Sequence, residues 1–318
     1  MPTITYPADP GEAALRLFVR WFGAHYARST HVVSTNPAEA GLTGVLSVGR
    51  QWSVAFSVVN TLAPEADMGW ESARAALESR LDGEGRSLLT WVPRGAPLPT
   101  EEPAASRFIV AAASAEAMAG DRLEMRRPVS LQLRRTSTKG SVVTVLGGLS
   151  ASWAQFTNRV PGSFQLNSMQ LHRLPSSTDE RDALAEQIVL AAGQPDVDES
   201  IVIPAEDVWT VNDVGSGGSC ILGSPLPETD ETSATLRRNL RRLLKEASPT
   251  LHEQADARAL LILGASTYAE DEKLSWTLRG MDPALHAGYD IIAIVTDGMV
   301  KPLLQPGRQT LPWDAPLG

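Results

Sequence analysis

The chain has 318 residues, of which 43% are hydrophobic and 20% charged, so it can bury a large core in one large domain or two ordinary ones. Its formal net charge of −9 repels phosphate backbones and anionic membranes, which disfavours nucleic-acid binding except through a local basic patch. The single cysteine, Cys220, excludes an internal disulfide and any zinc site built from cysteine pairs. No apolar run approaches the roughly 20 residues of a membrane helix, and the first residues do not resemble a secretory signal. We therefore expect a cytoplasmic protein without a membrane partner.

The first 92 residues predict a helix, three strands, a second helix and a fourth strand. The helices follow from apolar residues at helical spacing, and the strands from alternation of apolar with polar or small residues. Gly49 and Arg50 form a tight turn that makes the second and third strands a hairpin. The expected segments are Gly11–Tyr26, His31–Ser34, Gly44–Val48, Gln51–Val59, Trp70–Leu81 and Ser87–Val92.

The middle of the chain predicts an inserted β-rich region. Pro93–Ala105 is rich in proline and reads as a surface loop. Val129–Arg134 and Ser141–Leu146 alternate around Thr138, Lys139 and Gly140, which is typical of a β-hairpin. Asp179–Ala192 is expected to be an amphipathic helix.

The last third predicts a helix over Thr235–Leu251, followed by two strands that are apolar on both faces. These strands, Ala259–Leu263 and Ile291–Val295, are joined through a candidate helix at Glu272–Leu278, so we expect them to be adjacent or near-adjacent central strands of a mainly parallel or mixed sheet. The predicted fold class is α/β, with a mixed central sheet flanked by helices and an inserted β-hairpin region.

This order of elements also divides the chain into three expected parts. Residues 1–92 form the N-terminal part of the core, residues 93–234 an inserted or second β-rich region, and residues 235–318 the helix and strands that complete the core.

The order of helix, three strands, helix and strand resembles the core of the restriction-endonuclease-like superfamily, and the late Arg-rich helix with its two strands resembles the end of many diverged members. The resemblance covers about half of the chain and includes no sequence motif. It implies a magnesium site made by an acidic residue on the second strand and by a glutamate and a lysine on the third.

The residues that this site would require are absent from the chain. The interval Gly41–Pro64 contains no Asp, Glu or Lys, and the expected third-strand position reads Ala55 to Val58. Glu12 and Glu39 are the only carboxylates nearby. If the resemblance holds, the usual active site has been lost, and we expect no metal or cofactor.

A glycine-rich stretch from Asn212 to Cys220 is the most unusual local sequence. Its Asp213, Ser216 and Ser219 could bind an anion, and Cys220 could act as a nucleophile, with His172 as its base if the fold brings them together. The stretch matches neither a phosphate-binding loop nor a nucleophile elbow. The alternative is a flexible hairpin turn between Asp207–Val211 and Cys220–Gly223, with Cys220 as a small core residue.

Two further features are candidates for binding. Asp297 follows the strand Ile291–Val295, at the position where open α/β sheets place ligand-binding loops, although Asp-Gly after a strand is also an ordinary turn. The helix Thr235–Leu251 carries a basic face that could bind a phosphate backbone or an acidic partner, or could simply be solvated. That face consists of Arg237, Arg238, Arg241, Arg242 and Lys245.

These observations favour a non-catalytic interaction or scaffold component of a bacterial multi-protein system, whose partner is another protein. The alternative is a metal-dependent nuclease or other hydrolase with a displaced active site. Carboxylates that converge on one cleft would favour the enzyme, and an apolar binding surface would favour the interaction component.

Overall fold

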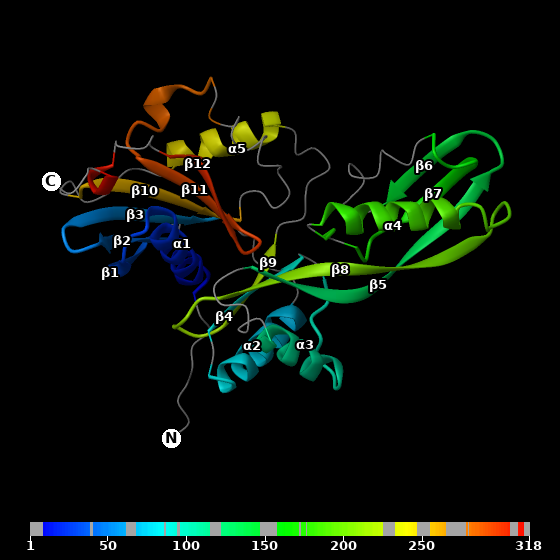
Figure 1. Ribbon diagram of the computed structural model, residues 1–318, viewed down its shortest axis with the longest axis horizontal. Helices are drawn as coiled ribbons and strands as arrows, with labels where there is room; N and C mark the ends of the chain where they lie inside the picture. Colours follow the sequence, from blue (N-terminus) through cyan, green and yellow to red (C-terminus); the bar gives the residue numbers. More distant parts are fainter. Residues whose placement is uncertain are drawn as a thin grey trace.

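The structure is a computed structural model that carries two six-stranded β-sheets and five α-helices in the described part of the chain (Figure 1). It describes residues 9–38, 41–61, 68–85, 87–93, 96–114, 122–146, 158–171, 173–175, 177–224, 233–246, 255–264, 278, 280–305 and 311–314. The helices are α1 Pro10–Tyr26, α2 Met68–Gly83, α3 Ala104–Ala113, α4 Thr178–Ala191 and α5 Ser233–Glu246. The strands are β1 Thr30–Ala38, β2 Gly41–Val48, β3 Trp52–Asn60, β4 Leu88–Pro93, β5 Leu123–Ser137, β6 Ser141–Leu146, β7 Gly162–Asn167, β8 Ser200–Asp213, β9 Cys220–Ser224, β10 Ala257–Leu263, β11 Ile291–Thr296 and β12 Met299–Leu304.

Sheet A combines the two ends of the chain in the order β1-β2-β3-β10-β11-β12. The first three strands are antiparallel neighbours, β10 runs parallel to both β3 and β11, and β12 returns antiparallel to β11. The prediction that Ala259–Leu263 and Ile291–Val295 are adjacent, parallel and buried is confirmed, because these segments pair residue by residue and all their side chains are buried. Most of the predicted helix Glu272–Leu278 lies outside the described residues.

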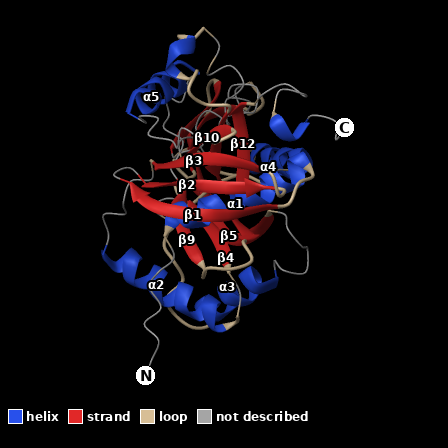
Figure 2. Cartoon of the chain, turned by 90° about the vertical axis from the view of Figure 1, so that its left-hand side faces the viewer, coloured by secondary structure: helices blue, strands red, loops and turns tan. Residues whose placement is uncertain are grey.

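Helices cover sheet A on both faces (Figure 2). Alternate residues of each central strand point to opposite faces, so Ala259 and Leu261 pack toward α1, whereas Leu260 and Ile262 pack toward α5. α1 contributes the apolar side chains Leu15, Phe18 and Phe22, and α5 contributes Leu240, Leu243 and Leu244. The predicted α/β class, with a mixed sheet flanked by helices, is therefore confirmed.

Sheet B is built from the middle of the chain in the order β6-β7-β5-β8-β4-β9. Its backbone is a long ribbon in which β5 and β8 pair antiparallel from Leu123 opposite Val211 to Arg134 opposite Ser200. α2 and α3 cover the β4–β9 end, and α4 covers the β6–β7 end. β4 belongs to this sheet, although it is the next strand in the chain after β1–β3 of sheet A.

Both hairpins predicted in sheet B are wrong in their pairing, although the strands exist. β7 lies between β5 and β6, and β4 lies between β8 and β9. β7 lies very close to β5 at Gly162, because a Cβ atom at that position would lie 2.7 Å from the backbone oxygen of Ser137. The alternation of apolar and polar residues indicates which side chains of a strand face the core, but it does not indicate which strand is its neighbour. Pairing the strands that are closest in sequence therefore gave the wrong neighbours.

We predict that replacing Ile262 by Asp prevents folding, because Ile262 is fully buried between α5 and sheet A. Burying an unpaired carboxylate costs several kcal/mol. Ile262→Val, which only removes a methyl group, should cost about 1 kcal/mol. Denaturant titration followed by circular dichroism checks both values, and near-native stability of the Asp variant would contradict the packing described.

Candidate functional site

The two sheets meet where the parallel strands of sheet A end. Open α/β sheets bind ligands beyond the carboxyl ends of their strands, and Asp297 lies there, directly after β11. In this chain sheet B fills that position. Leu263 and Val295, the last apolar residues of β10 and β11, pack against Leu89, Trp91 and Cys220 of sheet B.

An ion pair between Arg173 and Asp297 joins the sheets at this junction. The two residues are 3% and 2% exposed, so solvent is excluded from the pair. Arg173 is held in turn by β8, because its backbone N–H donates to the Asp207 carboxylate at 2.9 Å. Trp209 Nε1 donates to the other oxygen of Asp207 at 3.2 Å. Asp297 is therefore committed to a structural contact.

The turn that carries Asp297 is fixed from sheet B as well. Arg122 Nε donates to the backbone oxygen of Asp297 at 2.8 Å, and Asn212 Nδ2 donates to the backbone oxygen of Gly298 at 3.0 Å. Gly298 has a φ of 76°, a left-handed conformation that favours glycine. The Asp-Gly pair is thus a turn, in agreement with the alternative weighed for it, and its carbonyl oxygens are used for inter-sheet contacts.

The glycine-rich loop is clamped by α1 and presents its carbonyl groups inward. Arg16 donates to the backbone oxygens of Ser216 and Gly218, and Arg20 donates to that of Asp213. The Asp213 side chain accepts from the backbone N–H of Gly215 at 2.7 Å. A loop that cradles an anion must point its N–H groups at it, whereas this loop offers carbonyl oxygens to two arginines.

The end of the loop is held by the elements that flank it in space. The backbone N–H of Ser219 donates to Asp82 of α2 at 2.6 Å, and its hydroxyl oxygen accepts from the backbone N–H of Leu88 at 3.2 Å. Ser219 is 1% exposed. The loop therefore connects β8 to β9 around the end of β4, and not as the hairpin turn that the sequence predicted as an alternative.

Cys220 is a core residue with a thiol unsuited to nucleophilic chemistry. It is 1% exposed, and burial raises the pKa of its thiol to about 12. The thiol thus stays protonated, whereas the reactive form of a cysteine is the thiolate. His172 lies outside the described residues, so the structure does not place the proposed Cys220–His172 pair.

Next to Cys220 lies a buried carboxyl group, Glu78 of α2, which is 3% exposed. Burial raises its pKa to about 7, although a hydrogen bond from the Ile221 backbone N–H at 2.7 Å and the guanidinium of Arg74 at 3.3 Å both lower it. Glu78 Oε2 has no hydrogen-bond partner among the described residues. Glu78 therefore links α2 to β9 and titrates near neutral pH.

The basic face of the late helix is present on α5. Arg238, Arg241, Arg242 and Lys245 are exposed, while the leucines on the other side of the helix pack on sheet A. Arg237 lies in the same helix, but its side chain is outside the described part. Whether this face binds a partner stays a prediction.

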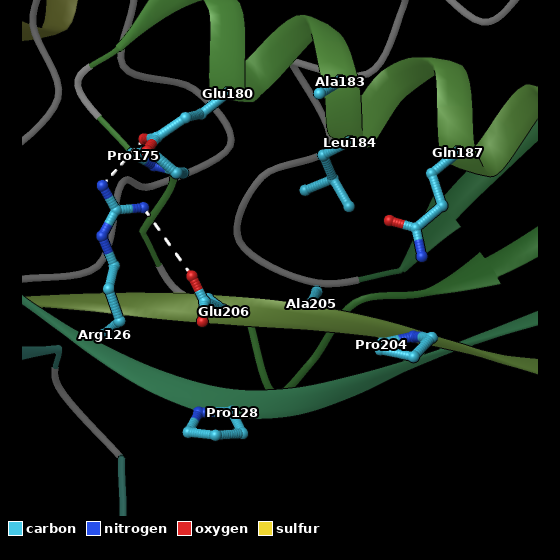
Figure 3. A pocket seen from close by; sticks show the side chains of 10 residues that line it. All are labelled: Arg126, Pro128, Pro175, Glu180, Ala183, Leu184, Gln187, Pro204, Ala205 and Glu206. Atoms are coloured by element: carbon cyan, nitrogen blue, oxygen red, sulfur yellow. Dashed lines mark hydrogen bonds and ion pairs between the residues drawn. The ribbon is translucent and has the colours of Figure 1, made fainter.

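A groove that the sequence did not reveal lies between α4 and the β5–β8 ribbon (Figure 3). Its volume is about 450 Å³. Apolar groups form most of its lining, and an ion-pair cluster of Arg126, Glu180 and Glu206 lies at one end. The remaining lining residues are Pro128, Pro175, Ala183, Leu184, Gln187, Pro204 and Ala205. The only signal in the sequence was a proline inside each long strand, Pro128 and Pro204, which is unusual for a central strand.

Comparison of the chain with protein families, with curated proteins and with solved structures gives no match. In the described ranges, no three His, Cys, Asp or Glu side chains lie together as a metal ion would require. None of the helices described is both long and apolar enough to cross a membrane. The function is therefore inferred from the groove and the junction.

We predict that Asp297→Asn costs about 3–5 kcal/mol of unfolding free energy, because it removes the negative charge that pairs with the buried Arg173 guanidinium. Asp213→Asn is the matched control, since Asp213 forms a solvent-accessible pair with Arg20 at 3.7 Å and should lose less than 1 kcal/mol. Adding Arg173→Met to Asp297→Asn should recover part of the loss. Equal stability of the two single variants, measured by urea denaturation, would show that the pair does not hold the junction.

We also predict that the protein loses stability as the pH rises from about 4.5 to about 7. Glu78 has its pKa raised from 4.5 to about 7 on folding, so the folded state binds the extra proton in this interval. Glu78→Gln keeps the acceptor for the Ile221 N–H and removes the charge. At pH 8 it should be more stable than the wild type by about 3 kcal/mol, and at pH 4.5 the difference should vanish. Denaturation across this range checks the slope, and Glu186→Gln, which removes an exposed carboxylate of α4, should leave it unchanged.

Proposed function

We propose that the chain is a cytoplasmic, non-catalytic interaction component of a bacterial multi-protein system, and that it binds a segment of a partner protein in the groove between α4 and the β5–β8 ribbon. The observation that carries this proposal is the groove itself. Its apolar lining supplies binding energy through burial, and its polar end supplies orientation.

The apolar surface extends beyond the groove in the direction away from the ion-pair cluster. Leu190 lies one turn after Gln187 on α4 and is 74% exposed, and Val202 lies two residues before Pro204 on β8 and is 63% exposed. Large apolar side chains at such exposure carry a solvation cost that a partner removes. Together they lengthen the surface available to a bound segment.

The polar groups that were candidates for catalysis support the same proposal. Asp297 is paired with Arg173, Cys220 is buried as a thiol, and the carbonyls of the glycine-rich loop are occupied by Arg16. Each of these groups serves the packing of sheet A against sheet B. The side chains that line the groove do not take part in this packing.

A metal-dependent nuclease or other hydrolase with a displaced site is the second candidate. It is favoured by one observation, since most of the elements that carry the resemblance to restriction-endonuclease-like proteins, α1, β1–β3, β10 and β11, lie together in sheet A with α5 against it. It is opposed by the carboxylates of the junction, because Asp297 and Asp207 both face Arg173 and already have their partners.

The groove is tested by selecting peptides from a random phage-displayed library on the purified protein. We predict that Ala183→Arg, which fills the groove, lowers the affinity of the recovered peptides at least tenfold in fluorescence polarisation. Ala111→Arg is the matched control, because Ala111 is exposed on α3, outside the groove. Failure to recover peptides that depend on Ala183 contradicts the proposal. Cleavage of plasmid DNA by the wild type with Mg²⁺ or Mn²⁺ would support the second candidate instead.

A further inference from the structure

The groove runs along the edge of β8. Three consecutive residues of this strand, Pro204, Ala205 and Glu206, line it. Successive side chains of a strand point to opposite faces of the sheet, so a pocket on one face would be lined by alternate residues only. Contact with all three indicates that the groove reaches the edge of β8, and Arg126 and Pro128 of the neighbouring strand β5 line another part of it.

Over half the length of β8, the backbone groups at this edge have no partner strand among the described residues. β4 pairs with β8 only from Thr210 to Asp213. The Val208 N–H points away from β5 and donates to the backbone oxygen of Arg173 at 3.3 Å. Backbone groups of alternate residues in a strand point to the same side, so those of Val202, Pro204 and Glu206 also point away from β5. In the described part of the chain no strand pairs with these three residues.

The chain itself shows how this edge is used. Arg173 lies beside Val208 as an added strand would, and two residues later Pro175 lines the groove. The groove therefore begins where the chain leaves the edge of β8. A further extended segment would continue the line of residues 173–175 along Glu206, Pro204 and Val202.

We propose that the partner segment binds in extended conformation as an added strand on β8, beneath α4, with a basic residue at the Glu180–Glu206 end. This inference rests on the proposed function and specifies the conformation and charge of the ligand. Main-chain hydrogen bonds to β8 provide affinity, and the apolar floor accepts alternate side chains of the segment.

The charge preference follows from the ion-pair cluster. Arg126 faces Glu180 at 2.7 Å and Glu206 at 4.0 Å, and the side chains of the two glutamates are 48% and 56% exposed. Arg126 also contacts Glu124 at 3.3 Å, and Glu124 pairs with Arg122 at 2.8 Å. The cluster thus holds three carboxylates and two guanidinium groups, which leaves this end of the groove net negative. A basic side chain of the ligand meets this charge, whereas an acidic one is repelled.

Pro204 makes the edge selective. Proline lacks an N–H, so the outward row offers the carbonyl oxygens of Val202, Pro204 and Glu206 but only two donors. The missing N–H of Pro204 weakens pairing with strand edges of any sequence. The side-chain contacts of the groove therefore determine which segment binds.

The experiment uses the groove-dependent peptides recovered from the library and compares Pro204→Ala with Pro128→Ala. Both prolines line the groove, but Pro128 shares the register of Ser130, whose N–H points to the opposite edge of the ribbon and donates to Gln170. Pro204→Ala supplies a donor to an added strand and should raise affinity about threefold to tenfold, whereas Pro128→Ala should not raise it. N-methylation of the peptide should weaken binding at alternate positions only.

The outcomes separate this inference from the proposed function. Three results together would overturn the added-strand conformation: Ala183→Arg blocks the peptides, Pro204→Ala does not raise their affinity, and N-methylation weakens binding without alternating along the peptide. Such peptides would bind the groove in another conformation, such as a helix. Glu206→Lys should shift the selected peptides from basic to acidic, and an unchanged preference overturns the charge assignment. Absence of any Ala183-dependent peptide overturns both proposals.

Discussion

The ion pair between Arg173 and Asp297 is the contact on which the architecture depends. It joins a residue of the segment that crosses sheet B to the turn after β11 of sheet A, and both side chains are almost completely buried. Two charges removed from water need each other and further hydrogen-bond partners, and β8 provides one because the Thr210 hydroxyl accepts from Arg173 Nη1 at 3.4 Å. Because the pair tolerates little displacement, it sets the position of sheet B, and with it the position of the groove, relative to sheet A.

The junction also explains why this α/β protein does not use the usual ligand position of its fold class. The carboxyl ends of β10 and β11 are covered by Leu89, Trp91 and Cys220, so an open crevice is replaced by a packed interface. The proposed binding groove lies on sheet B, whose long β5–β8 ribbon is incompletely paired along its edges by the strands that the structure describes. Pro128 and Pro204 lie where the outer edges of the ribbon have no partner strand among the described residues, which is where a strand tolerates proline.

Sheet A could largely be predicted from the sequence, and the groove could not. Ala259–Leu263 of β10 and Ile291–Val295 of β11 are apolar without interruption, which few structures other than buried parallel strands satisfy. The hairpin of β2 and β3 is specified by the short turn at Gly49. The pairing of β6 and β9 involves strands that are not their nearest in sequence, and the alternation of apolar and polar residues does not indicate which strand pairs with which. The site residues chosen from sequence were the chemically reactive types. They turned out to be contacts such as Asp297 with Arg173, because a buried structural carboxylate and a catalytic one look alike in sequence.

The insertion of β4 between β8 and β9 has a consequence for how the chain reaches this fold. β8 and β9 are separated by only six residues and could pair early as a local hairpin. In the folded protein β4 lies between them, so that hairpin would occupy its place. β4 precedes β8 by more than a hundred residues in the chain. β3 pairs with β10, which follows it by nearly 200 residues, so during synthesis its partner strand appears about 10 to 40 s later. The topology has a high contact order, so we expect slow folding and a nascent chain that exposes strand edges for seconds. The clamps of Arg16 and Asp82 on the glycine-rich loop hold β9 away from β8, and they disfavour the local hairpin that would trap the chain.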